Sequence, residues 1–180
     1  MKRIQRIKIT DVKHPLHIKG RKLYRQSFPE EERRDEDYFR ETLSCERFHN
    51  DVLVTDDNEF TGILYWWNLS GGIKYIEHFA TLPSLRGRGI GRKILSEFIN
   101  LCEDLILLEV EIPANKIQYR RINFYKRLGF YYNEHDYVQP PYAFDKPEVP
   151  LSIMSYPRSI TADELHSFVE KGHRSIHFRN

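Results

Sequence analysis

The stretch YIEHFATLPSLRGRGIGRK, residues 75–93, contains the features that decide the fold of this chain. Residues 73–81 are rich in β-branched and aromatic side chains, which predicts a strand. A turn with Pro83 follows, and then come glycines at alternate positions among arginines. The loop consists of Arg86, Gly87, Arg88, Gly89, Ile90, Gly91 and Arg92. The residues after this loop have helical amphipathic spacing, so the order is strand, glycine loop, helix.

This order of elements predicts an anion site. The first N–H groups of a helix have no intrahelical partner and lie at the positive end of its dipole. Glycines allow a ligand to approach the backbone closely, and arginines pair well with phosphate. The spacing excludes two nucleotide motifs: Lys93 is followed by Ile94 rather than Ser or Thr, and the third glycine comes one residue too early for the dinucleotide fingerprint.

The pattern Arg86-x-x-Gly89-x-Gly91 resembles the pyrophosphate loop of the GNAT superfamily of acyl-CoA-dependent N-acyltransferases. Residues 117–130, IQYRRINFYKRLGF, are similar to the second conserved segment of that family, a helix that ends in Tyr-x-x-x-Gly-Phe. An apolar run of strand length, residues 105–112, separates the two motifs. The resemblance is strongest over residues 73–130.

The resemblance implies a mixed α/β fold: a mostly antiparallel sheet of about six or seven strands, flanked by helices, with splayed parallel central strands. The length of 180 residues suits one domain. We expect residues 1–180 to form a single N-acetyltransferase domain, with an acyl-CoA-binding core at 73–130 and a C-terminal helix and tail at 157–180. The patterns predict strands at 4–10, 48–55, 60–67, 73–81, 105–112 and 151–156, and helices at 14–28, 91–102, 117–130 and 161–172, with a short helix after Pro29.

The function implied by the resemblance is transfer of an acetyl group from acetyl-CoA directly to a primary amine, without a metal. The loop from Arg86 to Arg92 would hold the diphosphate of coenzyme A. The strand end formed by Phe79, Ala80 and Thr81 would pair with the pantetheine arm through its backbone. A polar residue of the second helix would also touch the cofactor; the candidates are Asn115, Gln118 and Asn123.

Two side chains are candidate catalytic groups. Tyr125 matches the family's acid, and a phenol of pKa about 10 can protonate the departing thiolate. Glu77 is the first candidate for the base that deprotonates the amine. A carboxylate on a central strand is costly to bury unless it has a purpose, and this cost favours a functional role. Glu109, Glu111 and a water chain remain alternative bases. His78 has a suitable intrinsic pKa, but strand alternation predicts that it points away from Glu77.

Residues 28–41, FPEEERRDEDYFRE, are rich in carboxylates and have two interpretations. The acids could stabilise a helix start and face water, or they could attract a cationic amine to the acceptor groove. The neighbouring Trp66 and Trp67 should point to opposite faces of their strand. Neither feature identifies the acceptor, which could be a small molecule or a protein amine.

The composition limits other function classes. A formal net charge of +2 gives no electrostatic argument for nucleic acid or membrane. Cys45 and Cys102 lack metal-type spacing and read as reduced thiols, so we expect a cytoplasmic setting. A non-catalytic acyl-CoA-binding or sensing module remains an alternative, as does a nucleic-acid binder that uses the arginines of the two motifs. Dimers are frequent in the resembled family, so a homodimer is a further expectation.

Overall fold

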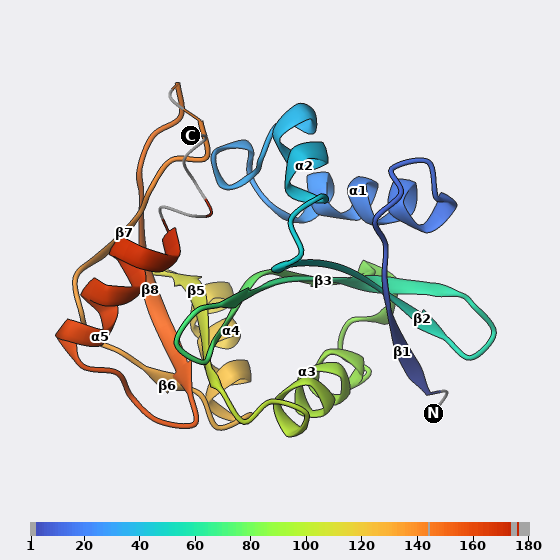
Figure 1. The fold of residues 1–180 in the computed structure, drawn as a ribbon. Helices are drawn as coiled ribbons and strands as arrows, with labels where there is room; N and C mark the ends of the chain where they lie inside the picture. The colour runs from blue at the N-terminus through green and yellow to red at the C-terminus, as the bar shows by residue number, and fades with distance from the viewer. Residues whose placement is uncertain (1–2, 144, 174–175, 177–180) are drawn as a thin grey trace.

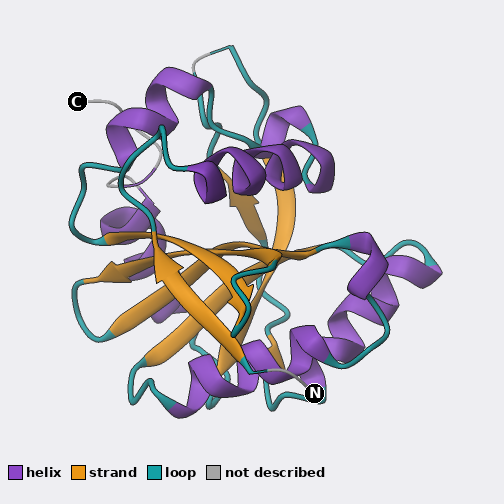
Figure 2. Cartoon of the chain, turned by 90° about the vertical axis from the view of Figure 1, so that its right-hand side faces the viewer, coloured by secondary structure: helices purple, strands orange, loops and turns teal. Residues whose placement is uncertain are grey.

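The computed structural model describes residues 3–143, 145–173 and 176. A single mixed sheet forms the central layer, and helices pack against both of its faces (Figures 1 and 2). The strands are β1 (Ile4–Lys8), β2 (Phe48–Thr55), β3 (Phe60–Leu69), β4 (Ile73–Thr81), β5 (Leu105–Glu111), β6 (Tyr131–Tyr132), β7 (Tyr137–Gln139) and β8 (Val149–Tyr156). The α-helices are α1 (Pro15–Ser27), α2 (Glu36–Thr42), α3 (Ile90–Asn100), α4 (Lys116–Lys126) and α5 (Ala162–Ser167). Three further helical turns are η1 (Glu30–Glu32), η2 (Pro83–Leu85) and η3 (Phe168–His173).

The sheet has eight strands in the order β1-β2-β3-β4-β5-β8-β6, and β7 pairs with β8. All pairs are antiparallel except β4 and β5, which run parallel. The predicted mixed sheet with parallel central strands is therefore confirmed. The expected six or seven strands become eight because β6 and β7 are only two and three residues long and carry little sequence pattern.

The two faces of the sheet carry different helices. On one face, Leu23 and Phe39 of α1 and α2 share a hydrophobic cluster with Leu165 of α5. On the other face, Leu95 of α3 and Ile122 of α4 belong to a second cluster. Figure 1 shows α1 and α2 above the sheet and α3 below it. The predicted opposite orientation of Trp66 and Trp67 is confirmed, because each tryptophan joins a different one of these clusters.

The helix boundaries follow from capping and close packing. Helix α1 continues through Gly20, where a Cβ would lie 3.3 Å from both Ile63 Cγ2 and the Tyr65 hydroxyl, so glycine lets the helix pack closely on the sheet. The capping box predicted from Thr161 and Glu164 is present at the start of α5. The predicted C-terminal helix at 161–172 is observed as α5 followed by η3, while residues 174–175 and 177–180 of the expected tail lie outside the described residues.

A gap opens between the two parallel strands. Strands β4 and β5 pair only from Ile73 with Leu105 to Ile76 with Leu108. Beyond Ile76, β4 stays paired with β3, while β5 stays paired with β8 up to Glu111. The end of β4 therefore has a free edge facing β5, as the resemblance implied.

A β-bulge distorts β4 next to this gap. Tyr65 of β3 lies opposite His78, whereas Trp66 lies opposite Ile76, so Glu77 is an extra residue without a partner on β3. The bulge puts both Glu77 and His78 on the face covered by α1 and α2, where the His78 ring packs 4.7 Å from Tyr24. The prediction that His78 points away from Glu77 is wrong, because strand alternation assumes an unbulged strand.

Candidate active site

The glycine loop has the backbone conformation that its sequence predicts. Gly87 and Gly89 have φ values of 77° and 75°, in the left-handed region that favours glycine, and Gly89 is the N-cap of α3. A Cβ on Gly91 would lie 3.6 Å from the rings of both Phe79 and Phe124. The start of α3 is thus enclosed by a ring from β4 and a ring from α4.

The backbone amides of this loop are available to a ligand. The first backbone hydrogen bond of α3 runs from the Lys93 N–H to the Gly89 carbonyl, at 3.0 Å. The preceding N–H groups, from Gly87 to Arg92, have no acceptor among the residues that the structure describes. Gly87, Arg88 and Gly89 are also exposed. Successive free amides at a helix start form an anion-binding nest.

Arginine side chains surround the amides. Arg86, Arg88 and Arg92 are exposed, and none forms an ion pair with another residue in the described part of the chain. A pocket of about 420 Å³ adjoins the loop and is lined by Ser84, Arg88 and residues of the β2–β3 hairpin. The loop therefore combines unpaired amides, unpaired cations and open space.

The end of β4 offers backbone groups to the gap. The Leu82 N–H donates to the Thr61 carbonyl at 2.9 Å, which fixes the alternation of the β3–β4 ladder. In this alternation the peptide groups of Ala80 face β3, whereas those of Phe79 and Thr81 face the gap. Of the three predicted backbone contacts, Phe79 and Thr81 lie at the free edge and Ala80 does not.

Tyr125 lies in the apolar cluster that packs α3 and α4 against the sheet. Its ring centroid is 5.2 Å from that of Phe124, which contacts the start of α3. Burial raises the pKa of Tyr125 to about 12, although the nearby Arg121 charge opposes this shift. No described group hydrogen-bonds the Tyr125 hydroxyl. The phenol is therefore protonated at neutral pH and free to donate its proton.

The polar residues of α4 that were expected to touch the cofactor are largely used to cap the helix. The Gln118 side-chain oxygen accepts the N–H groups of Ala114 and Asn115, and the Asn115 side chain accepts from the N–H of Gln118. This capping box supplies acceptors for the backbone N–H groups at the start of α4, and it occupies the side-chain oxygens of both Asn115 and Gln118. Asn123 is exposed on α4 and precedes Phe124. Asn115 and Gln118 thus have structural roles here, and Asn123 is the one of the three candidate cofactor contacts that takes no part in this capping.

The environment of Glu77 does not suit a general base. Its side chain is 0 % exposed and lies 2.7 Å from Nη2 of Arg34, which is also fully buried. Trp67 Nε1 and the Tyr142 hydroxyl donate to the same carboxylate, at 3.0 and 2.9 Å. Burial alone would raise the pKa of Glu77, but the Arg34 charge, and after it the neighbouring His78, lower it well below the usual range. A carboxylate with so low a pKa is a poor proton acceptor.

Other carboxylates lie at the gap, on the face covered by α1 and α2. Glu109 accepts a hydrogen bond from the Tyr75 hydroxyl at 2.7 Å and further bonds from Tyr137 and Gln139. Glu111 forms an ion pair with Arg121 of α4.

Glu32 of η1 joins these carboxylates, although its sequence position marks it only as one member of the acid-rich segment 28–41. Its turn is anchored to β4 by the His78 Nε2 atom, which lies 2.9 Å from the Glu32 carbonyl. Burial raises the pKa of the Glu32 carboxyl; the His78 charge opposes this, and the charges of Glu111 and Glu109 add to it. Pro29 followed by a glutamate run could have indicated such a turn, but nothing in the sequence places it over the gap.

The remaining acids of residues 28–41 fit the helix-start interpretation. The Asp35 side chain caps α2 by accepting the Tyr38 N–H at 2.6 Å. Glu36 and Asp37 form ion pairs with arginines of α1 and α2. Only Glu32 of this acidic cluster is both half-buried and close to the gap. Among residues 3–143, 145–173 and 176, no group of His, Cys, Asp and Glu is arranged to hold a metal ion, and no helix there is long and apolar enough to cross a membrane.

Comparisons with known proteins agree with this geometry. A model of the Acetyltransferase (GNAT) family matches residues 19–130. An acetyltransferase of the GNAT family from Bacteroides thetaiotaomicron is 34 % identical, with a TM-score of 0.86 over 99 % of both chains. The ribosomal-protein-S18-alanine N-acetyltransferase from Escherichia coli is 22 % identical, with a TM-score of 0.61 over 91 % of this chain and 97 % of that one.

A chimeric spermidine N-acetyltransferase from Vibrio cholerae and hSSAT has the same fold at 14 % identity, with a TM-score of 0.61 over 84 % of this chain and 93 % of that one. No curated protein sequence matches the chain. The matched family model covers more than half of the sequence, and the Bacteroides structure covers nearly all of it. With its splayed β4 and β5 and its glycine loop at the start of α3, the chain belongs to the GNAT acetyltransferase family.

Proposed function

We propose that this protein transfers an acetyl group from acetyl-CoA directly to a primary amine. The observation that carries the proposal is the run of unpaired amides from Gly87 to Arg92 beside the gap between β4 and β5. These amides, with Arg86 and Arg88, would hold the diphosphate of coenzyme A. The free β4 edge at Phe79 and Thr81 would pair with the pantetheine arm, and an N–H there would polarise the thioester carbonyl.

The two sides of the gap suggest different roles. Tyr125 and the glycine loop lie with α3 and α4, so this side would take the cofactor and protonate the departing thiolate. Glu32 and Glu109 lie on the side of α1 and α2, which would receive a cationic amine. The acceptor and the cofactor would thus approach the reacting carbon from opposite faces of the sheet.

Direct transfer fits the positions of the cysteines. Cys45 packs against the cluster under α1 and α2, and Cys102 follows α3 in the other cluster. Both are free thiols, and burial raises the pKa of Cys102, which lowers its nucleophilicity. Neither is placed at the gap as an acyl carrier. Two unpaired thiols also agree with the proposed cytoplasmic setting.

A thiol-release assay tests this function. Purified protein is mixed with acetyl-CoA and a panel of primary amines that contains spermidine, amino acids and lysine peptides, and free coenzyme A is measured. We expect release only in the presence of an amine, with the acetylated amine found by mass spectrometry. Calorimetric binding of coenzyme A without turnover on any amine would favour a non-catalytic acyl-CoA-binding module, and absence of binding would overturn the proposal.

Glu32 is the proposed base, because its carboxyl lies on the acceptor side and burial raises its pKa. We expect Glu32→Gln to lower kcat at saturating amine by about 100-fold, the low end of the usual contribution of a general base. The acid limb of the wild-type pH profile, which reports protonation of the base, should disappear in the variant. The profile is measured from pH 5 to 10 by thiol release.

The matched control is Glu31→Gln in the same turn, because Glu31 is exposed. It removes the same charge from the same segment without touching the gap. Equal rates for the two variants would show that Glu32 is not the base, and the same pair of measurements on Glu109→Gln and Glu111→Gln would then identify it.

A further inference from the structure

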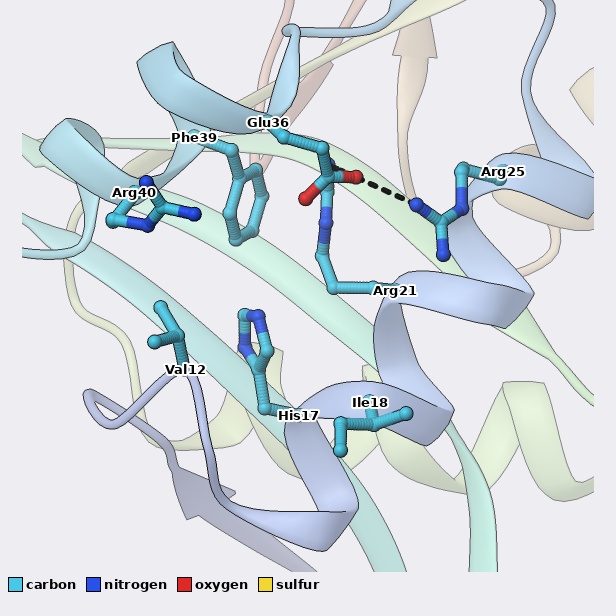
Figure 3. Close-up of a pocket in the computed structure, with 8 residues that line it drawn as sticks. All are labelled: Val12, His17, Ile18, Arg21, Arg25, Glu36, Phe39 and Arg40. Carbon is cyan, nitrogen blue, oxygen red and sulfur yellow. Dashed lines mark hydrogen bonds and ion pairs between the residues drawn. The ribbon is translucent and has the colours of Figure 1, made fainter.

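A second pocket lies between α1 and α2, apart from the proposed acetyl-transfer site. Its volume is about 250 Å³, and none of its lining residues belongs to the glycine loop or to the gap. Figure 3 shows Arg25 and Arg40 on opposite sides of the pocket, with the His17 ring pointing from α1 toward Phe39. The lining residues are Val12, His17, Ile18, Arg21, Arg25, Glu36, Phe39 and Arg40.

The pocket has surplus positive charge. Its single carboxylate, Glu36, uses one oxygen for two arginines: Oε1 lies 2.9 Å from Arg21 Nη2 and 2.8 Å from Arg25 Nη1. Arg40 pairs with Asp37, which lies outside the pocket lining. Burial, followed by the Arg21 charge, lowers the pKa of His17, so this ring is neutral at pH 7. Arg21 and Arg25 therefore share one carboxylate, which leaves one positive charge of the pocket without a counter-charge.

Arg21 has unused hydrogen-bond donors. Its side chain is only 4 % exposed, and its guanidinium carbon stacks 3.7 Å from the Phe39 ring centroid. Nη2 binds Glu36, whereas Nε and Nη1 are buried without a partner among the described residues. A buried charged donor without a partner is costly and calls for a ligand or an ordered water.

Buried polar atoms without a hydrogen-bond partner also occur in the sheet beneath α1, next to the pocket. Asn50 lies under His17, with its Nδ2 atom 3.3 Å from His17 Nδ1, and its Oδ1 atom is buried and unpartnered. The buried Tyr65 hydroxyl, next to Gly20 of α1, also lacks a partner. Four of the buried side-chain atoms without a partner among the described residues therefore lie at or beneath this pocket, and the other four belong to Arg34, His78 and Gln139.

We infer that this pocket binds a small oxyanion, a phosphate or carboxylate group, through Arg21, Arg25 and Arg40. The Arg21 guanidinium would supply its free Nε and Nη1 donors. The more exposed guanidinium groups of Arg25 and Arg40 would contact the anion from the two sides of the pocket. A volume of about 250 Å³ suits an anion with at most a small substituent and is too small for coenzyme A. The ligand would tie α1 to α2, the helices that cover the acceptor side of the gap.

Thermal unfolding measured over a series of inorganic phosphate concentrations tests the inference. Sodium chloride at equal ionic strength serves as the reference, and sodium acetate tests binding of a carboxylate. We expect a saturable rise in Tm, of about 5 °C or more once phosphate exceeds its Kd 100-fold. The Nε–H resonance of Arg21 in NMR spectra should shift with the same Kd. Arg25→Gln should weaken binding by about 10-fold or more, since a charge-assisted hydrogen bond is lost.

The matched control is Lys22→Gln, which removes one positive charge from the same helix at an exposed residue outside the pocket. Its Kd for phosphate should stay within about twofold of the wild type. Equal weakening in Lys22→Gln and Arg25→Gln would mean that the anion responds only to surface charge. That result, an unsaturable Tm effect or an unmoved Arg21 resonance would each overturn the proposed site. A response to acetate alone or to phosphate alone would identify the oxyanion.

Discussion

Replacing Tyr125 by Phe should lower kcat by about 100-fold or more, because the departing thiolate would lose its proton donor. The fold should not change. Tyr125 packs through its ring in the cluster with Ile122 and Phe130, and no described group hydrogen-bonds its hydroxyl. Removing a hydroxyl without a protein partner costs little stability, so Tm should change by about 2 °C or less.

The comparison that isolates this effect is Tyr119→Phe, since Tyr119 is a 55 % exposed tyrosine on the same helix. It should have wild-type kcat. The KM for acetyl-CoA should change by less than about threefold in either variant, because a proton donated only in the transition state contributes to kcat rather than to binding. A wild-type rate for Tyr125→Phe, up to the alkaline limit of the assay, would exclude the phenol as the acid.

The glycine loop could be predicted from its own residues because its function depends on the backbone, whereas the gap between β4 and β5 was expected only from the family resemblance. Gly87 and Gly89 have positive φ values, and a non-glycine residue would be strained there. The free amides follow from the helix start itself. Local sequence is sufficient for such features, and the same holds for the capping box at Thr161 and for most strand boundaries.

The environment of Glu77 was harder to predict because it depends on two features that are not local. The bulge at Glu77 changes which residues of β4 share a face, and the alternation of residues 75–81 contains no sign of it. The partner of Glu77 is Arg34, which precedes it by more than forty residues in a segment dominated by acids. A buried carboxylate on a central strand therefore suggested catalysis, whereas its tertiary contacts indicate a structural ion pair.

The buried ion pair between Arg34 and Glu77 leads to the second prediction with a large effect, a loss of folding stability when the pair is broken. We expect Glu77→Gln to lower the free energy of unfolding by about 3–5 kcal/mol, because it leaves the Arg34 charge buried without a counter-charge. For a chain of this length, that corresponds to a fall in Tm of about 6–20 °C. The Arg34 side chain has no exposed surface; besides Glu77 it lies among aromatic rings and donates to the Ile176 carbonyl at 3.3 Å.

A double-mutant cycle separates the pair from its surroundings. Arg34→Met alone should also destabilise, because Glu77 then becomes the unpaired charge. The double variant Arg34→Met, Glu77→Gln should be less destabilised than the sum of the single variants. The exposed pair formed by Arg40 and Asp37 gives the matched control, and Asp37→Asn should lower Tm by about 2 °C or less. Additive losses in the cycle would mean that the two side chains do not stabilise each other.

The pH dependence of folding stability, together with kcat at pH 8, distinguishes a structural role of Glu77 from a catalytic one. The folded-state pKa of Glu77 lies below its unfolded value of about 4.3, so its stabilising contribution is complete above that value and is lost as the pH falls. The stability difference between wild type and Glu77→Gln should therefore be constant above about pH 5 and shrink below about pH 4. At pH 8, and at a temperature where the variant is fully folded, kcat should fall by less than about 10-fold, since the residue acts only through the position of β4. A loss in kcat as large as that of Tyr125→Phe under these conditions would restore Glu77 as the base.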